Sequence, residues 1–195
     1  MNVRETIEKS VRARRRGEPF TPAEFKKAGS PATVRRELER LAVSGKIKMV
    51  AENTFVKPRT HELLGELAPA LPKVVRALTT KQGHVCQITG AEAANRLGLS
   101  SQVPMKPIYL TNGPSRLIRL GNLELELRHK PSRELPAAGR PAGDVIQALK
   151  YLGPEAVERS HVERLSNTLE PETKVNLRKL AAQLPAWMRT IIEQF

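Results

Sequence analysis

Helix start and stop signals follow one another closely over the first sixty residues, and their order restricts the fold more than any other sequence feature. The first segment predicts a helix from Asn2 to Arg16, because Val3, Ile7 and Val11 recur every four residues on one face. Gly17 follows a basic run and is typical of a helix end. The chain is therefore expected to open with an amphipathic helix.

Two further helices are predicted from their N-terminal signals. The segment TPAE, residues 21–24, has the spacing of a capping box with proline at the first helical position. It predicts a short helix over residues 22–28. Ser30-Pro31 repeats the start signal and predicts a third helix that runs to about Ser44, before Gly45. A tight turn between these two helices follows from their spacing.

The next segment, KIKMVAENTFVK at residues 46–57, predicts a β-hairpin of two short runs. Lys46 and Lys48 alternate with Ile47 and Met49, so we expect the apolar pair to face the core and both lysines to face outward. Helix, capped helix, turn, capped helix and hairpin is the order of a winged helix-turn-helix. We therefore predict such a domain over residues 1–60.

The charge of the chain is concentrated in this predicted domain. Lys and Arg number 33 against 20 acids, which gives a net charge of +13 and a pI near 10.4. Residues 1–60 hold 15 basic and 7 acidic residues, whereas the longer remainder holds 18 and 13. A basic surplus favours a polyanionic partner, because phosphate contacts release counterions. The alternative is that the surplus of basic residues serves solubility. Their concentration in residues 1–60 favours a nucleic-acid-binding module there instead.

The third predicted helix carries the candidate base-reading residues. Arg36 and Arg40 lie opposite its apolar stripe, and Thr33 lies near its start. In a helix-turn-helix this end of the helix meets base edges in the major groove. Arg36 is then expected to read guanine, Thr33 to touch a base, and Arg35 and Arg40 to bind phosphate. The alternative is a solvated charged face in which Glu39 pairs with Arg35.

Basic residues outside this helix are candidates for phosphate contacts. Lys46 and Lys48 suit phosphates beside the groove, and their alternative role is to protect an edge strand. The basic run at the end of the first helix is a candidate backbone clamp or merely a basic helix end. It consists of Arg12, Arg14, Arg15 and Arg16.

Residues 61–195 are predicted to form a second, mixed domain, which makes the whole chain an α+β protein. The segments MKPIYLT, SRLIRL and LELELRH predict three strands, the last two joined by a tight turn at Gly121-Asn122. From Pro141 onward the pattern is helical. Four basic residues on or beside these strands are candidates for an auxiliary basic surface, or are ordinary exposed strand residues: Lys106, Arg116, Arg119 and Arg128.

Catalytic patterns are missing from the sequence, so we expect a protein that is not an enzyme and needs no metal or cofactor. Its four histidines have no partner three or four residues away, and no phosphate-binding loop or nucleophile elbow occurs. Asp144 is the only aspartate, whereas metal-dependent phosphoryl transfer usually gathers several carboxylates. Glu124 and Glu126 on one strand lack the lysine of a nuclease motif, because Arg128 takes its place. Cys86 lies in the predicted strand HVCQI, where a small buried hydrophobe is expected.

The location expected from the sequence is the cytoplasm. No stretch approaches the roughly 20 apolar residues that span a bilayer. The opening MNVRETIEKS is charged and does not resemble a secretory signal, and a single cysteine allows no internal disulfide. No membrane partner is therefore expected.

The run PIYLTNGPSR followed by LELELRH, within residues 104–129, resembles the AbiEi-like family of antitoxins and transcriptional regulators. The preceding GAEAANRLGLSSQVP and the later VIQALKYLG and APAWMR are similar to that family in the same order. FTPAEF, the Ser30-initiated helix and the GKI that opens the hairpin match its winged N-terminus. The resemblance covers nearly the whole chain, and the order of the motifs carries it.

This resemblance implies the antitoxin of a type IV toxin–antitoxin system. Members repress their own operon at inverted repeats through the winged domain, and they counteract a nucleotidyltransferase-like toxin without a tight complex. The partners so implied are double-stranded promoter DNA and, functionally, that toxin. Two alternatives stay open, a plain DNA-binding regulator without a toxin and a module that binds RNA or a protein. An aromatic content of 4% argues against single-stranded RNA, whose bases usually stack on aromatic rings.

Overall fold

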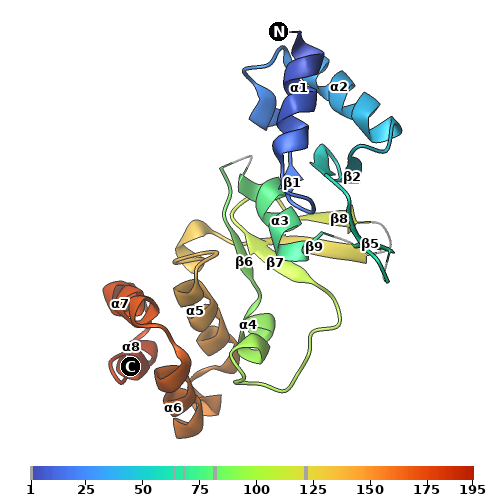
Figure 1. The fold of residues 1–195 in the computed structure, drawn as a ribbon. Helices are drawn as coiled ribbons and strands as arrows, with labels where there is room; N and C mark the ends of the chain where they lie inside the picture. The colour runs from blue at the N-terminus through green and yellow to red at the C-terminus, as the bar shows by residue number, and fades with distance from the viewer. Residues whose placement is uncertain (1, 64, 68, 81–82, 121–122) are drawn as a thin grey trace. The chain divides into compact units, whose positions relative to one another are not determined.

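The computed structural model describes residues 2–63, 65–67, 69–80, 83–120 and 123–195 and has an α+β fold (Figure 1). Its α-helices are α1 (Val3–Ala13), α2 (Pro31–Val43), α3 (Leu71–Thr80), α4 (Gly90–Arg96), α5 (Pro141–Leu152), α6 (Arg159–Thr168), α7 (Pro171–Leu180) and α8 (Ala186–Ile192). Its strands are β1 (Pro19–Phe20), β2 (Lys48–Ala51), β3 (Thr54–Val56), β4 (Arg59–His61), β5 (Gly65–Leu67), β6 (Cys86–Ile88), β7 (Ile108–Thr111), β8 (Arg116–Leu120) and β9 (Leu123–His129). Contacts divide the chain into two compact units, Met1–His84 with Ile118–Leu123, and Val85–Leu117 with Glu124–Phe195.

The predicted helix caps of the first unit are confirmed. The backbone N–H of Thr21 donates to Glu24 Oε1 at 2.8 Å, and the hydroxyl of Ser30 accepts from the backbone N–H of Thr33 at 3.3 Å. The segment after Thr21 is shorter than predicted, a single 3₁₀ turn called η1 (Pro22–Phe25). Helix α2 ends before Gly45, whose φ of +71° suits a residue without a Cβ.

The predicted hairpin is present, but the prediction that Met49 faces the core is wrong. Strands β2 and β3 pair antiparallel, and β1 joins the other edge of β3, so the sheet order is β1-β3-β2. Ile47 is buried as expected, whereas Met49 is 58% exposed. The register shifts between Met49 and Ala51, so Ala51 rather than Met49 turns inward. A bulge of this kind breaks the period-two alternation on which the prediction depended.

One apolar core holds the helices and the sheet of the first unit together. It comprises Ile7, Val11, Phe20, Phe25, Val34, Leu38, Leu41, Ile47 and Phe55. Helix α1 packs on α2, α2 on η1, and α3 on β1 and β3. The unit therefore continues to His84, past the boundary predicted at residue 60, because the apolar face of α3 with Val74 and Val75 is buried there. Strands β4 and β5, which follow β3 in the chain, pair antiparallel, and the sequence did not predict them.

A four-stranded sheet has the order β6-β7-β9-β8. Strands β6 and β7 belong to the second unit, whereas Ile118–Leu123, with most of β8 and the first residue of β9, are grouped with the first unit. The three strands predicted between residues 105 and 129 are confirmed, and the turn predicted at 121–122 lies outside the described residues. Strand β7 pairs antiparallel with β6 and parallel with β9. The sequence alternates Leu123, Leu125 and Leu127 with polar residues along β9, and Leu125 and Leu127 are buried whereas Leu123 is 42% exposed.

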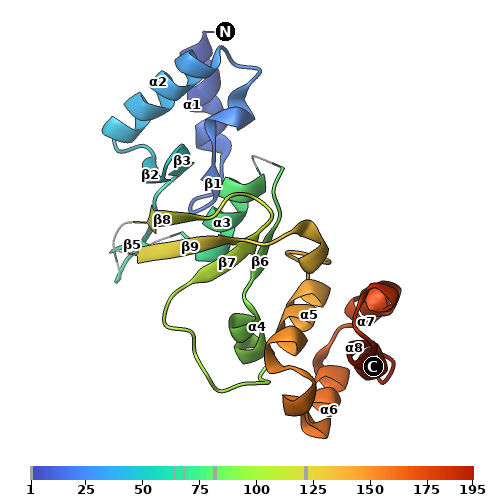
Figure 2. The same cartoon turned by 180° about the vertical axis from the view of Figure 1, so that it is seen from behind.

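The predicted helical C-terminal region is confirmed and packs on this sheet. Helix α5 contacts α4, β6 and α7, and α7 contacts α8 (Figure 2). Gly90 at the start of α4 makes the close approach to α5 possible, because a Cβ there would lie 2.5 Å from the carbonyl oxygen of Gln147. None of the helices in the described part of the chain is long and apolar enough to cross a bilayer.

Candidate nucleic-acid interface

Helix α2 buries one face and exposes the face that carries the predicted base-reading residues. Val34 and Leu38 are at most 1% exposed and anchor the helix in the core of the first unit. Thr33 and Arg36 lie on the opposite, exposed face. The Thr33 hydroxyl lies 2.8 Å from that of Ser30, so it is oriented by the residue that caps the helix. The rigid cap thus positions both exposed side chains on the first two turns of α2.

The three arginines of α2 differ in their partners. Arg35 Nε donates to Glu39 Oε1 at 2.9 Å, the pairing that the sequence offered as an alternative. Both side chains of that pair are more than half exposed, so the pair contributes little and can exchange for a phosphate. Among the residues that the structure describes, none forms a hydrogen bond or ion pair with Arg36. Arg36 therefore presents its guanidinium donors to solvent.

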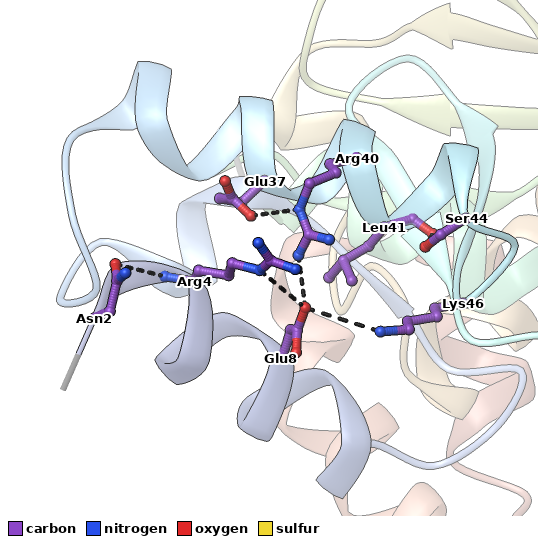
Figure 3. A network of polar contacts seen from close by, with 8 residues as sticks. All are labelled: Asn2, Arg4, Glu8, Glu37, Arg40, Leu41, Ser44 and Lys46. Carbon is purple, nitrogen blue, oxygen red and sulfur yellow. Dashed lines mark hydrogen bonds and ion pairs between the residues drawn. The ribbon is translucent and has the colours of Figure 1, made fainter.

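Arg40 is held inward by two carboxylates. Its Nε donates to Glu37 Oε2 at 2.8 Å and its Nη2 to Glu8 Oε1 at 2.6 Å (Figure 3). Glu8 also receives Arg4 at 3.5 Å and Lys46 at 3.8 Å. The hydrogen bond from Arg40 lowers the pKa of Glu8, so this carboxylate stays ionised. Glu8 thus joins α1, α2 and the segment before β2, a role that no sequence motif indicated.

An open hollow of about 530 Å³ lies along the exposed face of α2. Its lining includes Thr33 and Arg36, together with Ala32, Glu37 and the polar end of Arg40. Ala32 and Glu37 were not among the predicted site residues. Small side chains near the helix start leave the backbone accessible, so an edge of a flat ligand can approach Arg36 closely.

The two lysines of the hairpin segment are exposed but placed differently. Lys46 precedes β2 and faces Glu8, whereas Lys48 begins β2 and pairs in register with Val56. Lys48 keeps its outward position although the neighbouring alternation is broken at Met49. The sheet of the first unit therefore presents one lysine at its edge and one beside α2.

The basic run after α1 does not act as one surface. Arg12 and Arg15 are exposed, and Arg16 Nη1 donates to the carbonyl oxygen of Pro58 at 3.0 Å. Arg14 turns inward, with its guanidinium carbon 4.6 Å from the ring centre of Phe20 and its Nη2 2.8 Å from Glu24. Its ring contacts are typical of a cation–π interaction. Arg14 therefore covers the aromatic core and is not available to a phosphate.

The four candidates for an auxiliary basic surface do not share one face. Arg116 and Arg119 are three residues apart on β8, so alternation places them on opposite faces of the strand. Arg128 donates twice to Glu126, at 3.0 and 3.2 Å, and Lys106 lies in the exposed loop before β7. The hydrogen bond from Arg128 lowers the pKa of Glu126. The structure thus pairs Arg128 locally instead of adding it to a basic surface.

Two polar residues inside the second unit, Gln87 and Asp144, bind each other. Gln87 Nε2 donates to Asp144 Oδ1 at 2.5 Å, and Gln87 Oε1 accepts from the backbone N–H of Gly139 at 2.9 Å. Burial raises the pKa of Asp144, an effect that the hydrogen bond from Gln87 and the nearby Arg96 oppose. Among the described residues, no group of three or more His, Cys, Asp or Glu side chains could hold a metal ion. The only aspartate of the chain thus joins α5 to β6.

Cys86 is expected to react very slowly with thiol reagents. Burial raises its pKa to about 12, so at pH 8 only about one thiol in ten thousand is ionised. With 5,5′-dithiobis(2-nitrobenzoate) at pH 8, we expect labelling at least about 1,000-fold slower in the folded chain than in the chain unfolded in urea. Cys86 is half-buried, and rates within about tenfold of each other would contradict the raised pKa of its thiol.

Comparison with known proteins places the chain in one family. Residues 6–177 match a family of unknown function, DUF6088, and the chain belongs to this family. The matched region includes α2, the β2–β3 hairpin and the sheet of the second unit. No curated protein and no solved structure gives a significant match.

Proposed function

We propose that the chain is a sequence-specific double-stranded DNA-binding protein that represses transcription, and that it acts by binding rather than by catalysis. In this proposal α1, η1, α2 and the β2–β3 hairpin form a winged helix-turn-helix, and α2 enters the major groove. The observation that carries the proposal is the exposed first half of α2, where Arg36 and Thr33 face solvent on a capped helix. Arg36 is suited to the O6 and N7 atoms of guanine, which a guanidinium contacts with two parallel hydrogen bonds.

The charges around α2 support the same proposal. Three exposed basic residues of the first unit can reach phosphates: Arg12, Arg15 and Lys48. Ion pairs with Glu8 hold Arg40 of α2 and Lys46 close to each other. Phosphate contacts orient a protein on the duplex, and base contacts supply sequence preference. The excess of basic over acidic residues in the first sixty residues adds a long-range attraction to DNA.

The test is a titration of the full chain against labelled duplexes at several salt concentrations. One duplex carries the region upstream of the gene, and the other carries the same bases in scrambled order. We expect tighter binding to the upstream duplex and a linear fall of log affinity with log salt concentration. Equal affinity for both duplexes, or tighter binding to a single-stranded RNA of the same length, would contradict the proposal.

Lys48→Ala is expected to weaken binding to both duplexes alike. A lysine at the start of β2 reaches phosphate, which carries no direct sequence information. Its removal should make the slope of log affinity against log salt shallower by about one unit. Lys179→Ala, which removes an exposed lysine on α7, is the matched control and should leave the slope unchanged. A loss confined to the upstream duplex would assign Lys48 to a base contact instead.

We further propose that the chain represses its own operon and is the antitoxin of a type IV toxin–antitoxin pair. Support comes from the AbiEi-like order of motifs, in which PIYLTNGPSR includes β7 and the first residue of β8, and LELELRH forms β9. Cells that express a nucleotidyltransferase-like toxin encoded beside the gene should stop growing, and co-expression of this chain should restore their growth. A plain regulator would repress its promoter without protecting cells from such a toxin.

A further inference from the structure

A second cavity lies in the first unit, and its lining shares no residue with the hollow on the exposed face of α2. It has a volume of about 370 Å³, within the usual range for small-molecule sites. Residues from α1, the end of α2 and the segments before β2 and after β3 line it: Glu8, Val11, Arg12, Arg16, Leu41, Gly45, Lys46, Lys57 and Pro58. A Cβ built on Gly45 would meet no atom within 4 Å, so the space beside this residue is open.

Four cations surround this cavity against a single carboxylate. Arg12, Arg16, Lys46 and Lys57 oppose Glu8, and Glu8 already accepts a hydrogen bond from Arg40. The lining is therefore strongly positive although it lies beside a packed core. An anionic ligand would neutralise the positive charge of the lining, whereas a neutral or cationic ligand would not.

Two of the cations are fixed by the backbone and retain unused donors. Lys57 Nζ donates to the carbonyl oxygens of Arg12 at 2.7 Å and Arg14 at 3.4 Å, and Arg16 Nη1 donates to that of Pro58 at 3.0 Å. An ammonium has three donors and a guanidinium has five, so each group can bind a further acceptor while it stays in place. Fixed donors reduce the entropy that ligand binding would otherwise cost.

Part of the cavity lining is apolar. Val11 and Leu41 are at most 4% exposed and belong to the core of the first unit, so the apolar surface open to a ligand comes from Pro58 and from the stems of the lining arginines and lysines. A bare phosphate ion would leave this apolar surface uncovered, whereas an aliphatic or aromatic body would remove it from water. The combination of apolar lining and cationic groups defines the class of ligand.

We infer that this cavity binds a small organic anion that has an apolar body and a carboxylate, sulfonate or phosphate group. The apolar body lies against Pro58 and the apolar stems of the lining cations, and the anionic group accepts hydrogen bonds from Arg12, Arg16, Lys46 and Lys57. This inference stands on the first unit alone and does not depend on DNA binding.

The test uses the full chain and the fluorescent probe 8-anilinonaphthalene-1-sulfonate. We expect saturable binding at one site, and shifts of the backbone amide signals of Val11, Leu41 and Gly45 in a ¹⁵N-labelled chain. N-phenyl-1-naphthylamine, which has the same body without the sulfonate, should bind at least about tenfold more weakly. Octanoate should displace the probe at concentrations at which inorganic phosphate does not.

Substitutions at the rim locate the site. Arg12→Ala combined with Lys46→Ala should weaken the probe about 5- to 20-fold, because two charge-assisted hydrogen bonds are lost. Lys27→Ala removes an exposed lysine outside the lining and should leave probe binding unchanged. Circular dichroism of each variant checks that it is folded. Probe binding that the double variant leaves intact, equal binding of the neutral analogue, or displacement by inorganic phosphate as readily as by octanoate would overturn the inference.

Discussion

We expect Arg36→Ala to lower affinity for the operator, the site bound within the upstream duplex, about 5- to 150-fold. Much of the affinity for the scrambled duplex should remain. A bidentate contact between arginine and guanine is worth about 1–3 kcal/mol of discrimination against the wrong base. Arg36 lies on the first two turns of α2, opposite Val34 and Leu38, and is not held by a carboxylate among the described residues. The measurement is a titration of wild type and variant against operator and scrambled duplex at several salt concentrations.

Arg35→Ala is the matched control for this prediction. It removes an adjacent arginine of the same size and charge, but one that Glu39 already pairs at 2.9 Å. We expect similar, modest losses on both duplexes, as for a phosphate contact. Equal losses on both duplexes for Arg36→Ala would make Arg36 a backbone contact, and base reading would have to move to Thr33 or Arg35.

Phe20→Ala is expected to destabilise the first unit by about 3–5 kcal/mol, the largest stability effect that we predict. Removal of a fully buried phenylalanine loses its transfer free energy and leaves a cavity. The Phe20 ring packs edge-on against Phe25 and stacks on Phe55, with ring centres 5.8 and 6.1 Å away. Arg14 loses its aromatic partner in the same variant. DNA binding should fall with the folded fraction.

The measurement is urea denaturation followed by far-ultraviolet circular dichroism. Fluorescence would not report on Phe20, because Trp187, Tyr109 and Tyr151 all belong to the second unit. Phe20→Leu keeps most of the volume and should cost less than about 1.5 kcal/mol. Leu63→Ala truncates a side chain that is 89% exposed and should change little. A loss below about 1 kcal/mol for Phe20→Ala would contradict the core described here.

Local signals predicted the helices of the first unit well, because the interactions that start and end them are themselves local. The TPAE capping box and the Ser30 cap operate within four residues, so the sequence displays them directly. Periodicity likewise predicted which side of α2 is buried. The same reasoning failed at Met49, because a bulge depends on the partner strand and leaves no trace in a four-residue pattern.

Long-range pairings were the features that the sequence did not reveal. The parallel pairing of β7 with β9 joins segments that are separated by β8, and no adjacent-residue signal specifies it. Burial of α3 on β1 and β3 moved the boundary of the first unit to His84 for the same reason. In the candidate site, Glu8 forms ion pairs with Arg40 and Lys46, which are distant in the sequence. Arg14 contacts the Phe20 ring although its neighbours in the basic run are exposed.

Methylation interference tests the central claim, that α2 reads guanine in the major groove of duplex DNA. Dimethyl sulfate methylates guanine at N7, an atom that faces the major groove and that Arg36 is proposed to contact. With wild-type chain and the operator duplex, methylation of particular guanines should abolish binding. With Arg36→Ala, interference at one guanine in each half-site should disappear while the other positions remain. Binding of the wild-type chain that no guanine methylation alters would contradict the account.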